Sequence, residues 1–274
     1  MEQRDSNARR RSGKVPSAIR NRQGSRMKFK SVYDAVGHLP CTEESQCRVL
    51  YDWVREARPA QCLELGFLYG KTSCVIAAAL QENGGGHLTS LDLETVRNHQ
   101  GNPNILDHLA KIGLEAFVTP VFSRISYTWE LKKIIEKQTA DNRCEPCFDF
   151  IFLDGAHTWE TDVCAFFLAM KLLKPGGWFL FDDYMYSIEK SAWWSQAPEM
   201  QDKPEEYRKE KQVERLVTLA VSQHPDVETV VIRDNWAWAR KKPEAAVPAG
   251  PSVTHLTKTV AKRWLLDAVL RRKR

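Results

Sequence analysis

The stretch FDFIFLDGAHTWE, residues 148–160, holds five apolar residues among its first six and then stops on a carboxylate, Asp154, with His157 three residues later. A near-continuous apolar run of this length is typical of a strand that is buried on both faces of a parallel sheet. In open α/β sheets, ligands bind just beyond the carboxyl ends of such strands. The stretch therefore predicts a central strand over 148–153, with Asp154 and His157 at a functional site.

Strands and helices alternate on both sides of this stretch. Further strands are expected over 61–65, 87–92, 116–123 and 178–183, and helices over 42–58, 72–80, 104–113, 129–137, 159–173 and 204–222. A last pair of strands, 227–241, turns at Asp234-Asn235. This alternation is typical of a parallel sheet wrapped by helices. We therefore expect a doubly wound, Rossmann-like α/β fold with a mostly parallel seven-stranded sheet and a C-terminal antiparallel hairpin.

The charge of the 274-residue chain is concentrated at its ends. Residues 1–30 hold ten Lys or Arg and two acids, and residues 241–274 hold nine and two, so the net charge of +5 leaves −10 for residues 31–240. The low apolar content of residues 1–30 predicts a disordered basic tail. Residues 242–274 are expected to form a linker and a basic amphipathic helix. One folded domain over 31–241 remains between the two tails.

The tails are also the expected sites of weak contact with an anionic membrane or with nucleic acid, whereas simple solubility is the alternative explanation. No apolar segment approaches the roughly 20 residues of a membrane-spanning helix, and the N-terminus lacks the apolar core of a secretory signal. We therefore expect a cytoplasmic protein. Assembly as a homo-oligomer is left open.

The segment ELGFLYGKTS, residues 64–73, follows a predicted strand and opens a predicted helix. Its glycines, Gly66 and Gly70, let the backbone pass close to a ligand. The third glycine of a dinucleotide-binding motif is missing, because Leu68 and Lys71 occupy the third and sixth positions. An acid at position 64 instead suits a cofactor that carries a positive amino group and no phosphate, such as S-adenosylmethionine.

The order of CLELGFLYGKTS, LTSLDLE, FDFIFLDGAH and LLKPGGWFLFDDY resembles the class I S-adenosylmethionine-dependent methyltransferases. Among these the chain is most similar to the metal-assisted O-methyltransferases, a group with catechol, caffeoyl-CoA, macrocin and cephalosporin-hydroxylase-like members. The resemblance covers residues 42–241. It implies that the cofactor is bound by Glu64, Gly66 and Gly70 at its methionine end, by Asp92 at its ribose, and by Ser123 and Asp154.

Three carboxylates, Asp154, Asp182 and Asp183, follow two predicted strands that are expected to be neighbours. They would repel one another, and a hard divalent cation with oxygen ligands removes that cost. We therefore predict a site for Mg²⁺ or another divalent cation. The catechol-type pattern has an asparagine as its last ligand, and a loop in which Asp182 and Asp183 cap the next turn is the alternative.

His157 has two interpretations of similar weight: a general base that takes the proton of a metal-bound hydroxyl, or a residue at a helix start that bonds to nearby backbone. We expect a methyltransferase acting on a hydroxyl of a small molecule, with a sugar or natural-product glycoside favoured and a phenol next. Two other classes remain as alternatives. One is an NAD-dependent oxidoreductase on the same fold, and the other is a non-catalytic basic adaptor that binds RNA or an acidic membrane.

Overall fold

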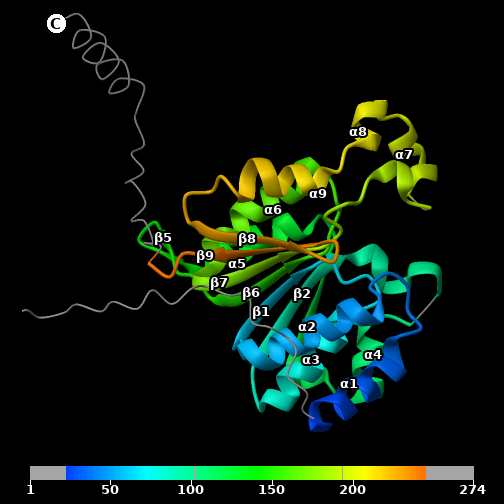
Figure 1. Cartoon of the computed structure of the whole chain (residues 1–274), viewed down its shortest axis with the longest axis vertical. Coiled ribbons are helices and arrows are strands. Elements are labelled where there is room, and N and C mark those ends of the chain that lie inside the picture. The colour runs from blue at the N-terminus through cyan, green and yellow to red at the C-terminus, as the bar shows by residue number, and fades with distance from the viewer. Residues whose placement is uncertain (1–22, 102, 193, 245–274) are drawn as a thin grey trace, which may run out of the picture.

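The computed structural model describes residues 23–101, 103–192 and 194–244, and its centre is one seven-stranded sheet in the order β3-β2-β1-β6-β7-β9-β8. The strands are β1 (Gln61–Leu65), β2 (His87–Leu93), β3 (Val118–Ser123), β6 (Phe148–Leu153), β7 (Leu173–Phe181), β8 (Val227–Arg233) and β9 (Trp236–Lys241). The first five strands in this list are parallel to one another, whereas β9 is antiparallel to both β7 and β8. The predicted fold class is confirmed (Figure 1).

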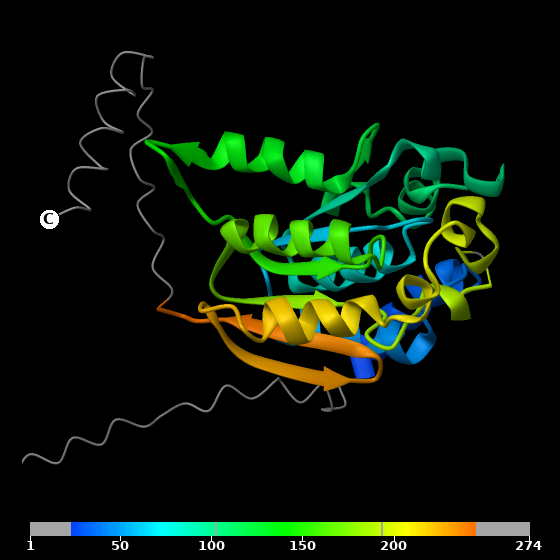
Figure 2. The ribbon, with the colours of Figure 1, turned by 90° about the horizontal axis from the view of Figure 1, so that it is seen from above.

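Helices cover both faces of the sheet, so the molecule has three layers (Figures 1 and 2). One face carries α1 (Gln23–Val36), α2 (Glu44–Ala57), α3 (Lys71–Asn83) and α4 (Ile105–Ile112). The other carries α5 (Tyr127–Gln138), α6 (Trp159–Leu172), α9 (Gln212–Arg215) and its continuation as a π-helix, η5 (Leu216–Val221). Because apolar side chains of the strands point alternately to the two faces, each helical layer closes its own hydrophobic core.

The remaining elements are short. They are the 3₁₀ turns η1 (Glu94–Gly101), η2 (Glu115–Phe117), η3 (Ile188–Lys190) and η4 (Trp194–Gln196), the helices α7 (Pro198–Gln201) and α8 (Glu205–Lys209), and a small hairpin of β4 (Thr139–Ala140) and β5 (Arg143–Cys144). Figure 1 shows α7 and α8 projecting beyond the sheet edge.

The single helix expected over 204–222 is wrong, because the chain is extended at Glu210 (φ −64°, ψ 138°). Gln212 lies directly after this break and is buried. Its amide donates to the Tyr207 carbonyl over 3.0 Å and accepts from the Trp159 backbone N–H over 2.7 Å. The break therefore lets one side chain bond the end of α8 and the start of α6, which no local pattern predicts.

The predicted disorder of residues 1–30 is corrected for its last part, since α1 begins at Gln23. Phe29 is 1% exposed, stacks on Tyr33 and lies under the Arg48 guanidinium, 3.5 Å from its ring centre. Phe29 therefore belongs to the core of the domain. The other predictions for the tails concern residues 1–22 and 245–274, which lie outside the described part of the chain.

The helix expected over 42–58 spans Glu44–Ala57. Its N-cap is Glu43, which forms a reciprocal capping box with Gln46. Within the described ranges, no helix has the length and apolarity that crossing a membrane requires.

Candidate active site

The register of the parallel strands brings four predicted site positions into one row. Leu65 of β1 pairs with Leu91 of β2 and with Leu153 of β6. Leu153 in turn pairs with Phe181 of β7. The residues that follow these partners are Asp92, Gly66, Asp154 and Asp182. They therefore lie side by side along the carboxyl edge of the sheet, where α/β proteins bind ligands.

The loop from Gly66 to Gly70 needs its two glycines. Both adopt left-handed backbone conformations, with φ of 91° and 86°. A Cβ atom on Gly66 would come within 1.8 Å of the Asp154 carbonyl oxygen, and one on Gly70 within 2.5 Å of an Ile105 side-chain carbon. The glycines thus let the loop run close against β6 and α4, which leaves its outer side for a ligand.

Asp92 fixes this loop from the neighbouring strand. Its Oδ2 accepts hydrogen bonds from the backbone N–H groups of Phe67 and Leu68, over 2.8 and 2.7 Å. Its Oδ1 accepts from the Leu93 N–H over 2.7 Å. The side chain is partly exposed, so the carboxylate retains lone pairs for the vicinal hydroxyls of a ribose.

Glu64 does not lie where a cofactor ligand is expected. Its carboxyl group is fully buried beneath the loop and accepts hydrogen bonds from three hydroxyls, those of Thr72, Ser73 and Ser90. Burial raises its pKa to about 7, although the three hydroxyls oppose the shift. Glu64 therefore ties the start of α3 to β1 and β2, and its effect on a cofactor is through the loop.

Ser123 is likewise turned into the protein. It is 2% exposed, donates to Glu130 Oε1 over 2.9 Å, and accepts from the backbone N–H groups of Ile125 and Ser126. These bonds use its hydroxyl to shape the turn between β3 and α5. The geometry does not support the predicted contact between Ser123 and the cofactor.

The three aspartates predicted to bind a metal gather at the ends of β6 and β7. The carboxyl groups of Asp154 and Asp182 lie close enough that the charge of Asp182 raises the pKa of Asp154, and two such groups repel each other as anions when no cation lies between them. Asp182 Oδ1 accepts from the Asp183 N–H (2.7 Å) and from the indole N–H of Trp236 (2.5 Å). Asp183 has a left-handed backbone (φ 54°), and its Oδ1 accepts from the Asn235 amide over 3.2 Å.

Burial and neighbouring charges raise the pKa values of Asp154 and Asp182. Burial, followed by the charges of Asp182 and Asp183, holds the pKa of Asp154 well above its usual range. Burial and the charge of Asp183 raise the pKa of Asp182 to about 6, and His157 opposes this shift. Carboxyl groups that resist ionisation in this way are stabilised as anions by a cation.

The chemistry of the three aspartates suits a metal ion, whereas their arrangement in this structure is not that of a complete metal site. Within the part of the chain that the structure describes, no three His, Cys, Asp or Glu side chains are arranged to hold a metal ion. Asp183 is turned toward Asn235, and one oxygen of Asp182 is already bonded twice. The donors that fit a cation are the Asp154–Asp182 pair, and Mg²⁺ commonly takes one or two protein carboxylates together with water.

His157 stands between two of these carboxylates. Its Nε2 lies 3.6 Å from Asp154 Oδ1 and 3.7 Å from Asp183 Oδ2. The Tyr186 ring packs against the imidazole, with 5.2 Å between the ring centres. His157 also has a left-handed backbone (φ 53°). The imidazole therefore faces the carboxylates, which is the placement that the general-base interpretation of His157 requires.

A buried network that the sequence did not indicate holds the loop before His157. Asp162 of α6 is 2% exposed; burial raises its pKa, and the charge of His157, the Tyr127 hydroxyl and the backbone N–H groups of His157 and Ala156 oppose this shift. The Tyr127 hydroxyl donates to Asp162 Oδ1 over 2.5 Å and accepts from the Ala156 N–H over 3.1 Å. In the sequence, Asp162 is only an acid in the first turn of a helix, so no signal could have found this role.

Comparison with known proteins bears on the family and the fold of this chain. Residues 63–184 match the family model described as a methyltransferase domain. A search of curated proteins found no match. A protein from Klebsiella pneumoniae classed as an O-methyltransferase has 18% identity over 82% of this chain and 92% of its own, with a TM-score of 0.55.

Two further solved structures have the same fold. The O-methyltransferase from Bacillus cereus, solved with S-adenosylhomocysteine, has 17% identity over 82% of this chain and 93% of its own, with a TM-score of 0.51. The S-adenosylhomocysteine-bound methyltransferase PaMTH1 from Podospora anserina has 14% identity over 81% of this chain and 89% of its own, with a TM-score of 0.54. The match of residues 63–184 to a methyltransferase domain and the shared Rossmann-like fold therefore confirm the resemblance of the motifs to the S-adenosylmethionine-dependent methyltransferases.

Proposed function

We propose that this methyltransferase moves a methyl group from S-adenosylmethionine to a hydroxyl oxygen of a small molecule, with Mg²⁺ at the Asp154–Asp182 pair. The observation that carries the proposal is the row of Asp92, Gly66, Asp154 and Asp182 along one sheet edge. In this proposal Asp92 accepts hydrogen bonds from the ribose hydroxyls, Gly66 belongs to the loop beside the cofactor, and Asp154 and Asp182 hold the cation. A hydroxyl placed beside the cation is then next to the donor.

The charge of the edge favours S-adenosylmethionine over a nicotinamide dinucleotide. Asp92 and Asp154 attract the sulfonium and amino groups of the former and repel the pyrophosphate of the latter. Lys71 stands at the start of α3, where a phosphate would bind, yet its Nζ is buried and donates to the Thr42 carbonyl over 2.8 Å. An NAD-dependent oxidoreductase is therefore disfavoured.

A divalent cation at the Asp154–Asp182 pair would lower the pKa of an acceptor hydroxyl bound next to it. The chain's own contribution is to keep both carboxyls in place. The backbone N–H of Asp154 donates to the Leu65 carbonyl over 2.9 Å, and that of Asp182 donates to the Leu153 carbonyl over 3.0 Å. These bonds continue the ladders of the sheet, so the pair sits on its rigid part.

His157 is the base in this proposal. Its Nε2 faces the same carboxyl edge, and the side chain is 13% exposed, so a bound acceptor can reach it. Asp154 and Asp183 would stabilise the imidazolium that forms when His157 takes the proton. Transfer itself then needs alignment of donor and acceptor and exclusion of water.

The test is a calorimetric titration of the full chain with S-adenosylhomocysteine, with and without Mg²⁺, and with NAD as the control. We expect S-adenosylhomocysteine to bind, NAD not to bind, and Asp92→Ala to weaken binding by about 10-fold to 100-fold, the range for a lost hydrogen bond. Methyl transfer to hydroxyl compounds, followed with labelled S-adenosylmethionine, separates the enzyme from a basic adaptor. Tight NAD binding without S-adenosylhomocysteine binding would refute the proposal.

A further inference from the structure

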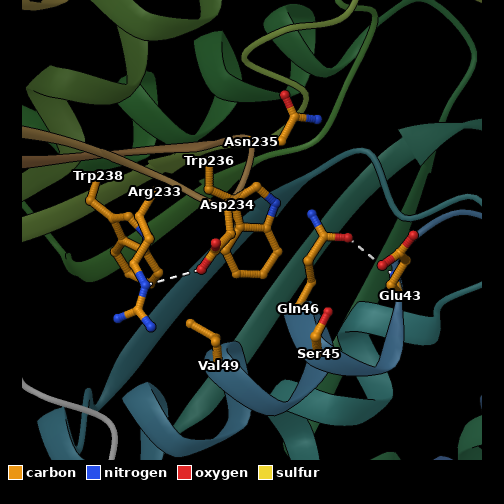
Figure 3. Close-up of a pocket in the computed structure, with 9 residues that line it drawn as sticks. All are labelled: Glu43, Ser45, Gln46, Val49, Arg233, Asp234, Asn235, Trp236 and Trp238. Atoms are coloured by element: carbon orange, nitrogen blue, oxygen red, sulfur yellow. Dashed lines mark hydrogen bonds and ion pairs between the residues drawn. The ribbon is translucent and has the colours of Figure 1, made fainter.

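A pocket of about 450 Å³ lies between the first turns of α2 and the turn of the β8–β9 hairpin (Figure 3). It is lined by Glu43, Ser45, Gln46 and Val49 of the α2 segment, and by Arg233, Asp234, Asn235, Trp236 and Trp238 of the hairpin. The volume falls in the range of roughly 300–1,000 Å³ that small-molecule sites occupy.

The pocket continues the row of site residues on the side away from the cofactor loop. Phe181 of β7 pairs with Ala237 of β9, so Trp236 is the next position along the edge after Asp182. The Trp236 indole N–H donates to Asp182 Oδ1, and the Asn235 amide donates to Asp183 Oδ1. Two residues that line the pocket thus bond directly to the carboxyls beside which methyl transfer is proposed.

We infer that this pocket holds the body of the methyl acceptor, and that the acceptor is a neutral molecule with a ring and hydroxyl groups, not one that carries a phosphate or a coenzyme A ester. The inference rests on the proposed function, because the pocket is a site for an acceptor only if methyl transfer takes place at the adjoining edge.

The charges of the lining disfavour anions. Arg233 is the one cation among the residues that line the pocket, and its Nε is paired with Asp234 Oδ2 at 3.0 Å. Glu43 adds a second carboxylate, and Asp182 and Asp183 lie directly behind the wall. With two carboxylates and one cation, the lining has a net charge of −1, which disfavours a phosphate.

The other lining residues suit a neutral ring. The apolar part of the lining is formed by Val49 and by Trp236 and Trp238, which are almost fully buried, whereas Ser45 and Gln46 provide polar groups at the helix start (Figure 3). The Gln46 carbonyl oxygen already accepts from the Glu43 N–H, so its amide N–H groups and the Ser45 hydroxyl can bond hydroxyls of a ligand. This mixture of an apolar body and a few polar groups is typical of small-molecule sites.

The test measures binding of three probes to the full chain saturated with S-adenosylhomocysteine, by ligand-observed NMR in chelator-treated buffer. The probes are phenyl β-glucoside, catechol and phenyl phosphate, so that only the last carries an anion. Ser45→Trp fills the pocket from an exposed position, and Glu56→Trp, exposed on the last turn of the same helix, is the matched control. Ser45→Lys adds a cation, with Glu56→Lys as its control.

We expect at least one neutral probe to bind the wild type at millimolar concentration, to bind Ser45→Trp about tenfold or more weakly, and to bind Glu56→Trp unchanged. Phenyl phosphate should bind Ser45→Lys and neither the wild type nor Glu56→Lys. The inference is overturned if no neutral probe binds the wild type, if Ser45→Trp binds it equally well, or if phenyl phosphate binds the wild type as tightly. Affinity for S-adenosylhomocysteine, measured separately, reports on the proposed function itself.

Discussion

The Tyr127 hydroxyl donates to Asp162 Oδ1 across 2.5 Å, and through this bond helix α5 and helix α6 jointly hold the loop that carries His157. Gly155 of that loop packs so closely on Tyr127 that a Cβ atom there would lie 2.6 Å from the hydroxyl oxygen. The buried pair of Tyr127 and Asp162 therefore stabilises the loop in which His157 has its left-handed backbone. Neither Tyr127 nor Asp162 reaches the carboxyl edge itself, so both are positioning residues.

We expect Asp162→Asn to lower kcat by about 10-fold to 100-fold, a smaller loss than removal of the general base itself would cause. Affinity for S-adenosylhomocysteine should not change, because Asp162 bonds to Tyr127, which holds the His157 loop and not the glycine loop. The check is a double-mutant cycle with His157→Ala. A further loss of kcat when Asp162→Asn is added to His157→Ala would mean that Asp162 does not act through His157.

His157→Ala should slow turnover by about 10²-fold to 10⁴-fold, the range for loss of a general base. Mg²⁺ affinity should be retained, because the donors of the proposed cation site are Asp154 and Asp182. Steady-state kinetics and a calorimetric Mg²⁺ titration of the same preparation provide the two measurements. Wild-type turnover in this variant would leave His157 with only a structural role at the helix start.

Removal of divalent cations should abolish methyl transfer and leave S-adenosylmethionine binding largely intact, and added Mg²⁺ should restore transfer. Asp154→Asn and Asp182→Asn should reproduce this loss, since each removes a negative charge from the proposed cation site with little change of shape. Asp149→Asn is a control on the same strand, because the Asp149 carboxylate bonds to Lys174 and to the backbone of Ala60 and Gln61. Full activity in excess chelator would refute the metal hypothesis.

Glu64 should give the stability of the protein a distinctive pH dependence. Its pKa is raised from 4.5 to about 7 on folding, so below pH 4.5 the carboxyl is protonated in both states and contributes nothing. As the pH rises toward 7 the unfolded state ionises first, and folding should lose up to about 3 kcal/mol. Glu64→Gln should lack this loss.

The measurement is urea unfolding of the wild type and of Glu64→Gln at a series of pH values. The difference between their free energies of unfolding should change across the window from 4.5 to about 7 and be flat on either side. Parallel curves for the two proteins would show that Glu64 is not held in its protonated form. Gln can still accept from one or two of the three hydroxyls, so the variant is expected to fold.

The boundary of the domain is tested by two trimmed forms, residues 23–244 and residues 31–244. Because Phe29 is buried against Tyr33 and Tyr51, the shorter form should have a lower Tm, whereas both should bind S-adenosylhomocysteine. Equal Tm values would mean that the start of α1 contributes nothing to stability.

The same trimmed forms test the proposed role of the tails. The full chain should bind anionic vesicles more strongly than residues 23–244 do, and this binding should weaken with salt, as screened electrostatic attraction does. Equal vesicle binding by the full chain and by residues 23–244 would show that the tails are only solvated charge.

The local pattern of residues was enough to predict the seven strands of the main sheet, their alternation with helices, and the carboxylates at their ends, but not the small β4–β5 hairpin. Apolar runs such as 148–153 mark buried strands because a strand covered on both faces must be apolar throughout. Asp92, Asp154 and Asp182 could be predicted at the edge for the same reason, since each is the first carboxylate after such a run. His157 could be predicted at the same edge because it follows Asp154 by only three residues.

Only the tertiary structure decided which way each polar side chain turns and which distant residues meet. Glu64 and Ser123 looked like cofactor ligands but face the interior, because their hydrogen-bond partners, Ser90 and Glu130, come from other elements. Trp236 bonds to Asp182 across 54 residues of sequence because β9 pairs with β7 in one particular register. Register is set by packing of whole strands and helices against each other, and a one-residue shift would turn every side chain to the opposite face, so it is not encoded in any single segment.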